Sequence, residues 1–253
     1  MTDTQILPNA HSFFHPGGPT GCILMHGFSS SPEEILPLDA CLTQLGYTTL
    51  GLRFAGHGTT PADMKNVRWT DWLANIEDAF HILQGHCQKI VLIGQSMGGM
   101  LSLTAAAYLP VDAVIALSTP YWMPSQQEQI INRLTALVRP NIRKRNVQPH
   151  PQWGIRREAG YPAYCGYPAK IHHQTDLLIN AMVNSLSRVT APVLLIQSRQ
   201  DGLIPPISLE KIQSGLKASR VTPVWIEGLG HGITMDPLAE KAFLPIREFL
   251  EKL

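Results

Sequence analysis

The chain has 253 residues, a length that supports one large hydrophobic core and is short for two independent ones. Hydrophobic residues make up 44% and charged residues 15%, which excludes disordered and fibrous chains, and no apolar run approaches the roughly 20 residues of a membrane-spanning helix. The net charge of +1 argues against nucleic acid as a partner, because phosphate binding needs a basic surplus.

The start of the chain and its cysteines predict a cytoplasmic protein. The first residues, MTDTQILPNAHSFF, lack the basic segment and long apolar stretch of a secretory signal. The four cysteines show no paired spacing, which is typical of reduced thiols in a reducing compartment. The sequence leaves the oligomeric state open.

Short apolar runs alternate with amphipathic stretches through most of the chain. This alternation predicts an α/β fold, with a mostly parallel sheet covered by helices on both faces. In chain order, the predicted strands are Gly21–Met25, Tyr47–Phe54, Lys89–Gly94, Ala113–Leu117, Pro192–Gln197 and Val221–Ile226.

Helices are predicted between these strands. Ser31 is placed to cap the first one, Pro32 suits its first position, Glu34 would complete a capping box, and Gly46 would end the helix. The remaining predicted helices are one over Thr70–Leu83, one opened by Ser96, and one over Leu238–Leu253 that Pro245 interrupts or kinks.

The segment 121–190 breaks this rhythm. It holds nine Lys or Arg and three Asp or Glu, a surplus of six, whereas the rest of the chain holds eleven and sixteen, a deficit of five. It is rich in proline and aromatic residues, with helical stretches only around Gln126–Val138 and Thr175–Ser187. An insertion of this length is too long for an ordinary loop. The sequence therefore predicts a core of residues 1–120 and 190–253, and a cap of residues 121–189 over one edge of the sheet.

One motif indicates a nucleophile. Gly94-Gln95-Ser96-Met97-Gly98 matches G-x-S-x-G, in which a sharp strand-to-helix turn exposes the serine and leaves no room for flanking side chains. The strand KIVLI precedes it and the apolar stretch MLSLTAAAYL follows it, as such a turn requires. This context favours Ser96 as the nucleophile.

A serine hydroxyl needs a base, and the base needs a group that orients it. His231 lies between two glycines after the last predicted strand, and Asp201 ends the run VLLIQSRQD. The chain order is then Ser, Asp, His, which is the order expected with a serine on such a strand-to-helix turn. Glu227 and Asp236 are weaker candidates for the acid, because one comes a strand too late and the other follows the histidine.

The negative charge that develops on an attacked carbonyl oxygen needs backbone N–H donors. By position, the donors should be the amides of Met97, next to the nucleophile, and Phe28, in the loop after the first strand. His26 and His57 are interpreted as structural histidines. No metal-ligand spacing, phosphate loop or dinucleotide fingerprint occurs, so no metal and no cofactor are expected.

Taken together, the sequence resembles the small bacterial carboxylesterases of the α/β-hydrolase superfamily, and behind them the monoacylglycerol lipases. The resemblance rests on LMHGFSSSPEE, LRFAGHGTTPADM followed by TDWLANIEDAF, IGQSMGG, QSRQDGLIPP and GLGHGITMD. It implies the α/β-hydrolase fold and a cofactor-free serine carboxylesterase acting on short- to medium-chain esters. Its triad would be Ser96, Asp201 and His231, with the Phe28 and Met97 amides as oxyanion hole.

Alternatives remain open at this point. The same triad serves monoacylglycerol lipases and hydrolases of lactones or C–C bonds, and the fold also occurs in non-enzymatic ligand-binding proteins. An epoxide hydrolase or dehalogenase is disfavoured, because those enzymes need Asp where this chain has Ser96. Basic side chains of the cap could attract an anionic substrate or a membrane surface, or form a solvated face: Arg139, Arg143, Lys144, Arg145, Arg156 and Arg157.

Overall fold

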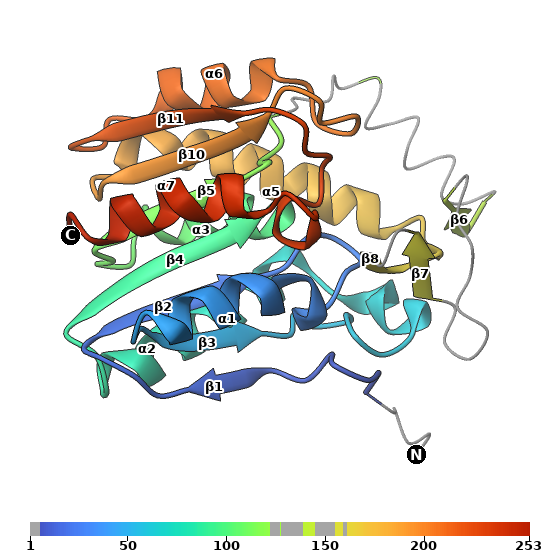
Figure 1. The fold of residues 1–253 in the computed structure, drawn as a ribbon. Helices are drawn as coiled ribbons and strands as arrows, with labels where there is room; N and C mark the ends of the chain where they lie inside the picture. Colours follow the sequence, from blue (N-terminus) through green and yellow to red (C-terminus); the bar gives the residue numbers. More distant parts are fainter. Residues whose placement is uncertain (1–5, 122–126, 128–138, 145–154, 159–160) are drawn as a thin grey trace.

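A seven-stranded sheet forms the centre of the computed structural model, which describes residues 6–121, 127, 139–144, 155–158 and 161–253 (Figure 1). The strand order is β1-β3-β2-β4-β5-β10-β11, and every neighbouring pair is parallel except β1 with β3. The strands are Phe13–His15 (β1), Thr20–Met25 (β2), Thr48–Leu52 (β3), Lys89–Gln95 (β4), Ala113–Leu117 (β5), Val193–Ser198 (β10) and Val221–Ile226 (β11).

Helices cover both faces of this sheet, as Figure 1 shows. One face carries α1 and α7, and the other carries α2, α3, α5 and α6. The α-helices are Leu36–Gln44 (α1), Trp69–Gln84 (α2), Met97–Ala105 (α3), Ile171–Ser185 (α5), Ile207–Gly215 (α6) and Glu240–Leu250 (α7), and the 3₁₀ helices are Pro32–Ile35 (η1), Pro61–Asn66 (η2), Leu186–Arg188 (η3) and Ile233–Met235 (η4). This arrangement confirms the predicted α/β-hydrolase fold class.

Strand β4 explains why the central strands are continuously apolar. Successive side chains of a strand point to opposite faces of the sheet. Ile90 and Leu92 accordingly join the core under α2 and α3, whereas Val91 and Ile93 join the core under α1 and α7. The middle of a strand that is buried on both faces is therefore apolar at successive positions.

The predicted capping box of the first helix is wrong. Ser31 makes no side-chain cap, and Glu34 does not reach back to the backbone of Ser31. Instead, the carboxylate of Glu34 is fully buried and accepts hydrogen bonds from the amide of Gly27 and the side chain of Gln95. The carboxylate of Glu34 therefore bonds to residues of other segments and does not cap the helix.

The predicted end of the same helix is confirmed. Gly46 adopts φ +84°, a left-handed conformation that costs glycine nothing. Its amide donates to the carbonyl of Thr43 at 3.0 Å, and the amide of Tyr47 donates to that of Leu42 at 3.1 Å, the bonding pattern of a Schellman motif.

The long insertion connects β5 to β10, which are adjacent and parallel in the sheet. Its described parts include Asn141–Arg143 (β6) paired with Gly166–Pro168 (β9), and Ile155–Glu158 (β7) paired with Tyr161–Tyr164 (β8). They lie beyond the carboxyl ends of the parallel strands (Figure 1). The predicted helix over residues 126–138 lies, except for residue 127, outside the described residues. Helix α5 matches the second predicted helix, and it packs in the core beside α3, so the division of the chain at 121 and 189 stays a prediction.

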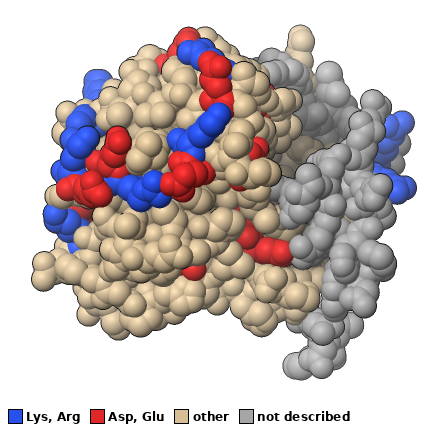
Figure 2. Space-filling model, in the orientation of Figure 1, with Lys and Arg blue, Asp and Glu red and all other residues tan. Residues whose placement is uncertain are grey.

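The surface carries charges of both signs. Figure 2 shows Lys and Arg interspersed with Asp and Glu in the upper left part of the view, around α7, whereas the surface over α1 is mostly uncharged. In the part of the chain that the structure describes, no helix combines the length and apolar character that a bilayer crossing requires. Among the same residues, no group of three or more His, Cys, Asp or Glu is arranged to hold a metal ion.

Candidate active site

Ser96 stands at a sharp turn between β4 and α3. Its backbone has φ 54° and ψ −112°, a conformation that side-chain-bearing residues rarely adopt and that persists only where the surroundings impose it. A Cβ atom on Gly94 would lie 2.1 Å from the carbonyl carbon of Gly98, and one on Gly98 would lie 2.4 Å from the carbonyl oxygen of Met25. The two glycines of the motif are therefore required by close packing around the turn.

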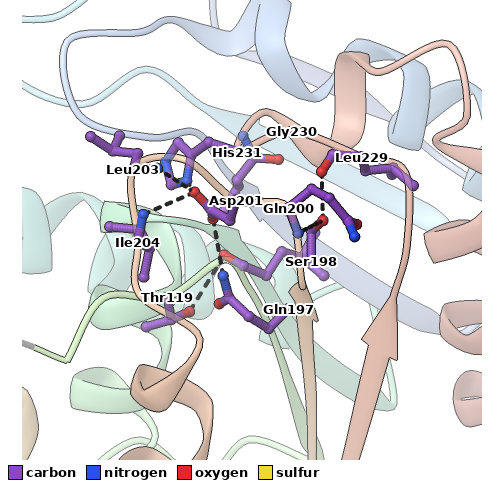
Figure 3. Close-up of polar contacts among 12 residues, drawn as sticks. Thr119, Gln197, Ser198, Gln200, Asp201, Leu203, Ile204, Leu229, Gly230 and His231 are labelled. Atoms are coloured by element: carbon purple, nitrogen blue, oxygen red, sulfur yellow. Dashed lines mark hydrogen bonds and ion pairs between the residues drawn. The ribbon is translucent and has the colours of Figure 1, made fainter.

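His231 and Asp201 come together at the ends of two neighbouring strands. Asp201 follows β10 and His231 follows β11, and Figure 3 shows the two side chains pointing toward each other. His231 Nδ1 lies 2.9 Å from Asp201 Oδ2. The second oxygen, Oδ1, accepts from the amides of Leu203 at 2.8 Å and Ile204 at 2.9 Å. Both carboxylate oxygens are thus held in place.

These contacts keep Asp201 ionised. Burial of the side chain opposes its ionisation, but the hydrogen bond and charge of His231 and the two amides outweigh burial and lower the pKa of Asp201 below its ordinary value. An ionised Asp201 can only accept at His231, so the proton of a neutral imidazole stays on Nδ1. The Nε2 lone pair is then left to take a proton from a substrate-attacking group.

Three polar residues that the sequence analysis did not single out brace this pair. Gln197 donates to Asp201 Oδ2 at 3.0 Å. Ser198 donates to the carbonyl of Leu229, and Gln200 accepts from the amide of Gly228 at 2.8 Å, so the loop after β10 is bound to the loop after β11 (Figure 3). A signal existed: Gln and Ser end the otherwise apolar run VLLIQS, and polar residues there must find buried partners.

The two weaker acid candidates lie elsewhere. Glu227 is exposed, and its carboxylate lies 3.8 Å from Arg199. Asp236 accepts from the amide of Gly230 at 3.2 Å and from that of Leu238 at 2.9 Å, which makes it a turn-capping residue. Among the acids of the described residues, Asp201 is the one bonded to His231.

The serine turn and the histidine loop are joined next to the reacting groups. Gln95 Oε1, one residue before Ser96, accepts from the amide of Thr234, three residues after His231, at 3.1 Å. Within the described residues, no hydrogen bond links Ser96 itself to His231. Such a bond is often long until substrate binds.

The two amides expected to bind the oxyanion are available. In the described part of the chain, neither the amide of Phe28 nor that of Met97 donates to a protein acceptor. A Cβ atom on Gly27 would lie 3.4 Å from Ser96 Cβ, so the loop after β2 passes directly beside the serine. Both amides are therefore free to bind a ligand oxygen near this side chain.

His26 helps to orient the first of these amides. Its Nδ1 donates to the carbonyl of Gly27 at 2.8 Å, and its Nε2 accepts from the amide of Phe54 at 3.4 Å. Because the carbonyl and N–H of a trans peptide point in opposite directions, fixing the carbonyl of Gly27 also fixes the N–H of Phe28. Burial lowers the pKa of His26 well below its ordinary value, which keeps the ring neutral.

His57 is also buried inside the protein. Its Nδ1 donates to the carbonyl of Ala55 at 3.0 Å, and its ring lies among those of Phe28, Phe54 and Trp72. Burial lowers the pKa of His57 to about 4. These contacts support its interpretation as a structural histidine.

The inserted segment touches the loop that follows β2. The amide of Tyr164 donates to the carbonyl of Ser29 at 2.8 Å, and the hydroxyl of Ser30 donates to the carbonyl of Pro162 at 2.7 Å. The ring of Tyr167 lies 4.9 Å from that of Phe28, edge to face. The segment therefore packs within two residues of a predicted oxyanion donor.

A family model described as serine aminopeptidase, S33, matches residues 20–238. The chain belongs to this family. The matched residues include strands β2, β4 and β5, the serine turn, and the loops that hold Asp201 and His231.

Several known hydrolases can be aligned with the chain over nearly its whole length. It is 26% identical over 237 residues to the thermostable monoacylglycerol lipase of Bacillus sp. (strain H-257), covering 91% of this chain and 90% of the relative. It is 25% identical over 242 residues to a carboxylesterase of Bacillus subtilis (strain 168), covering 95% and 96%. A solved structure from a study of two metagenome-derived lipolytic enzymes, LipS and LipT, has a TM-score of 0.87 and 27% identity. The alignment covers 98% of this chain and 100% of that chain.

These matches confirm the predicted resemblance and the predicted class, an ester hydrolase with the α/β-hydrolase fold. In this S33-family hydrolase, the hydroxyl of Ser96, the imidazole of His231 and the amides of Phe28 and Met97 follow the carboxyl ends of strands β4, β11 and β2. Such a set can attack a carbonyl carbon, accept the proton and bind the resulting oxyanion.

Proposed function

We propose that this protein is a serine carboxylesterase that hydrolyses short- to medium-chain carboxylic esters through an acyl-enzyme. Ser96 acts as nucleophile, His231 as general base and Asp201 as the carboxylate that orients His231. The observation that carries the proposal is the hydrogen bond between His231 Nδ1 and Asp201 Oδ2. The loop of His231 is itself hydrogen-bonded, through Thr234, to Gln95 in the strained serine turn.

In the first half of the reaction, Ser96 Oγ attacks the ester carbonyl carbon while His231 Nε2 takes the hydroxyl proton. The carbonyl oxygen becomes an oxyanion that accepts hydrogen bonds from the amides of Phe28 and Met97. When the C–O bond breaks, His231 returns its proton to the leaving alcohol oxygen, and the acyl group stays on Ser96.

Water then enters the site of the alcohol. His231 takes one proton from it as the oxygen attacks the acyl carbon, and returns that proton to Ser96 Oγ when the second tetrahedral intermediate collapses. One ester and one water yield one acid and one alcohol. The residues named here complete the cycle by themselves.

Replacement of the serine tests this proposal. Ser96→Ala should lower kcat for a p-nitrophenyl ester by about 10³-fold or more while the circular dichroism spectrum stays unchanged. A matched control is Ser214→Ala, an exposed serine on α6 that bonds only within its own helix, which should keep full activity. A fluorophosphonate should label the wild-type protein and the control but not Ser96→Ala. Equal turnover by Ser96→Ala and wild type would refute the mechanism, and a wild-type protein that neither labels nor turns over would favour a ligand-binding role.

Monoacylglycerol lipase activity is the second candidate, because the Bacillus sp. relative bears that name at an identity equal within one per cent to that of the carboxylesterase. Both activities use the same triad and differ in the alcohol and the acyl length. A series of p-nitrophenyl esters and monoglycerides of increasing chain length separates them. Higher kcat/KM on long-chain monoglycerides than on short aryl esters would favour the lipase, and hydrolysis of lactones but not open esters would favour neither.

A further inference from the structure

We infer that Glu34 is a positioning residue of the active site, whose buried carboxylate holds the oxyanion loop, the nucleophile turn and the histidine loop in one network. The inference rests on the proposed function, because it explains how three loops of the proposed mechanism keep their relative positions. The local sequence pattern predicts a helix-capping role for this side chain, but the structure shows no such cap.

The network is a closed ring of hydrogen bonds. Glu34 is fully buried, with Oε2 accepting from the amide of Gly27 at 2.6 Å and Oε1 accepting from Gln95 Nε2. Gln95 Oε1 accepts from the amide of Thr234 at 3.1 Å. The hydroxyl of Thr234 donates to the backbone carbonyl of Glu34 at 2.7 Å and so closes the ring.

The three residues bonded to Glu34 or to its neighbour in this network each lie within three residues of a group of the proposed mechanism. Gly27 precedes the oxyanion donor Phe28, Gln95 precedes Ser96, and Thr234 follows His231 by three residues. These residues belong to segments that are far apart in the chain, after β2, at the end of β4, and in η4 after β11. A carboxylate at their junction determines how the donor, the nucleophile and the base face one another.

The chemistry of the ring requires a carboxylate at position 34. Both oxygens face N–H donors, and Gln95 cannot reverse its amide without turning its NH₂ toward the amide of Thr234. In Glu34→Gln, the new NH₂ must meet either the amide of Gly27 or the NH₂ of Gln95. One donor–donor contact is then unavoidable, and a buried polar group without a partner forces the loops apart.

Exchanging the two side chains removes that contact. In the double variant Glu34→Gln with Gln95→Glu, the new amide at position 34 accepts from Gly27 and donates to the new carboxylate at position 95. That carboxylate can still accept from the amide of Thr234. All bonds of the ring regain a donor and an acceptor, although the charge has moved by one side chain.

The decisive experiment compares Glu34→Gln, Gln95→Glu and the double variant on a p-nitrophenyl ester. We expect Glu34→Gln to lower kcat on the order of 10²-fold, the size of effect seen when an oxyanion donor is lost, with KM changed less than twofold. Affinity for an aryl boronic acid, which mimics the tetrahedral intermediate, should fall in parallel with kcat/KM. The double variant should regain at least tenfold of the lost kcat. Glu248→Gln, the same change at an exposed position of α7, is the control and should match wild type.

The outcomes separate this inference from a purely structural role and from the proposed function. If Glu34→Gln keeps more than half of the wild-type kcat, or if kcat falls only with the melting temperature and the exchange restores neither, the inference is wrong. Should Glu34→Gln not fold, Thr234→Val removes one bond of the ring and should lower kcat about threefold at unchanged KM, and an unchanged kcat would overturn the inference. Wild type and Ser96→Ala are measured in the same assay, so loss of serine-dependent turnover in wild type would refute the proposed function instead.

Discussion

The loops at the carboxyl ends of the central strands and the segment inserted between β5 and β10 are built in different ways. Ser96 and Asp201 follow strands that are buried on both faces, β4 and β10, whereas His231 follows the edge strand β11. Buried polar side chains tie one loop to the next. The described strands of the insertion form two separate pairs, and they meet the rest of the protein along the loops that follow β2 and β3. From this comparison we propose that the loops at the strand ends position the reacting groups, whereas the insertion selects the substrate.

The largest effect should come from the carboxylate that orients His231. Asp201→Asn places an NH₂ toward either His231 Nδ1 or the backbone amides of Leu203 and Ile204, which all donate to the carboxylate now. The imidazole would then carry its proton on the wrong nitrogen, and we expect kcat to fall by roughly 10³- to 10⁴-fold with little change in KM. Steady-state kinetics on one aryl ester measures this. A loss below tenfold would mean that the loops do not hold the chemistry as described.

A second prediction concerns His57, which is buried in the loop after β3 with its ring beside that of Phe28. The unfolded chain binds a proton on this histidine near pH 6.5, whereas the folded protein does so only near pH 4, so the free energy of unfolding is largest above pH 6.5 and falls as the pH drops toward 4. The loss attributable to His57 should total about 3 kcal/mol over this window. His57→Asn, whose amide can donate to the same carbonyl of Ala55, should show a flatter pH dependence in urea melts. Equal slopes for the two proteins would contradict the prediction.

The attachment of the insertion can be weakened at Tyr164. Its buried hydroxyl accepts from the amide of Thr59 at 2.9 Å and donates to the carbonyl of Gly56 at 3.2 Å. Tyr164→Phe leaves that amide without a partner and should lower the free energy of unfolding by about 1–3 kcal/mol. If the insertion selects substrates, the ratio of kcat/KM between long and short esters should change while kcat on an acetate ester stays within about threefold. A uniform loss on all esters would assign the insertion a catalytic role as well.

The smallest expected effect is electrostatic. Arg139 and Arg143 of the insertion are exposed, whereas Lys144 donates to the hydroxyl of Ser29. If these arginines attract an anionic ester, kcat/KM for such a substrate should fall about threefold between low and high salt, because ions screen charges over a few ångströms at molar concentration. A neutral ester should show no change, and Arg139→Gln with Arg143→Gln should remove the salt dependence. The same rate at all salt concentrations would leave the basic residues as a solvated face.

Some parts of the fold gave no sequence signal strong enough to predict them. Strand β1 has three residues at the edge of the sheet, where one side of the strand is free and an apolar pattern is not required. Helix α6 is only nine residues long, and the sequence analysis predicts no helix there. Short elements depend on their neighbours, because nine residues are too few to form a stable helix alone.

Sequence patterns by themselves predicted the parallel sheet, the glycine-flanked serine turn and the candidates Asp201 and His231. Alternation and turn chemistry are properties of neighbouring residues, and chain order is read directly from the sequence. The tertiary structure alone decided the role of Glu34, the bond from Ser198 to the carbonyl of Leu229, and the docking of Tyr164 on the loop after β2. Their partners lie far away in the chain, so no window of sequence contains both ends of the bond. A buried polar group must find its partner wherever the fold brings one, and only the folded arrangement tells which one that is.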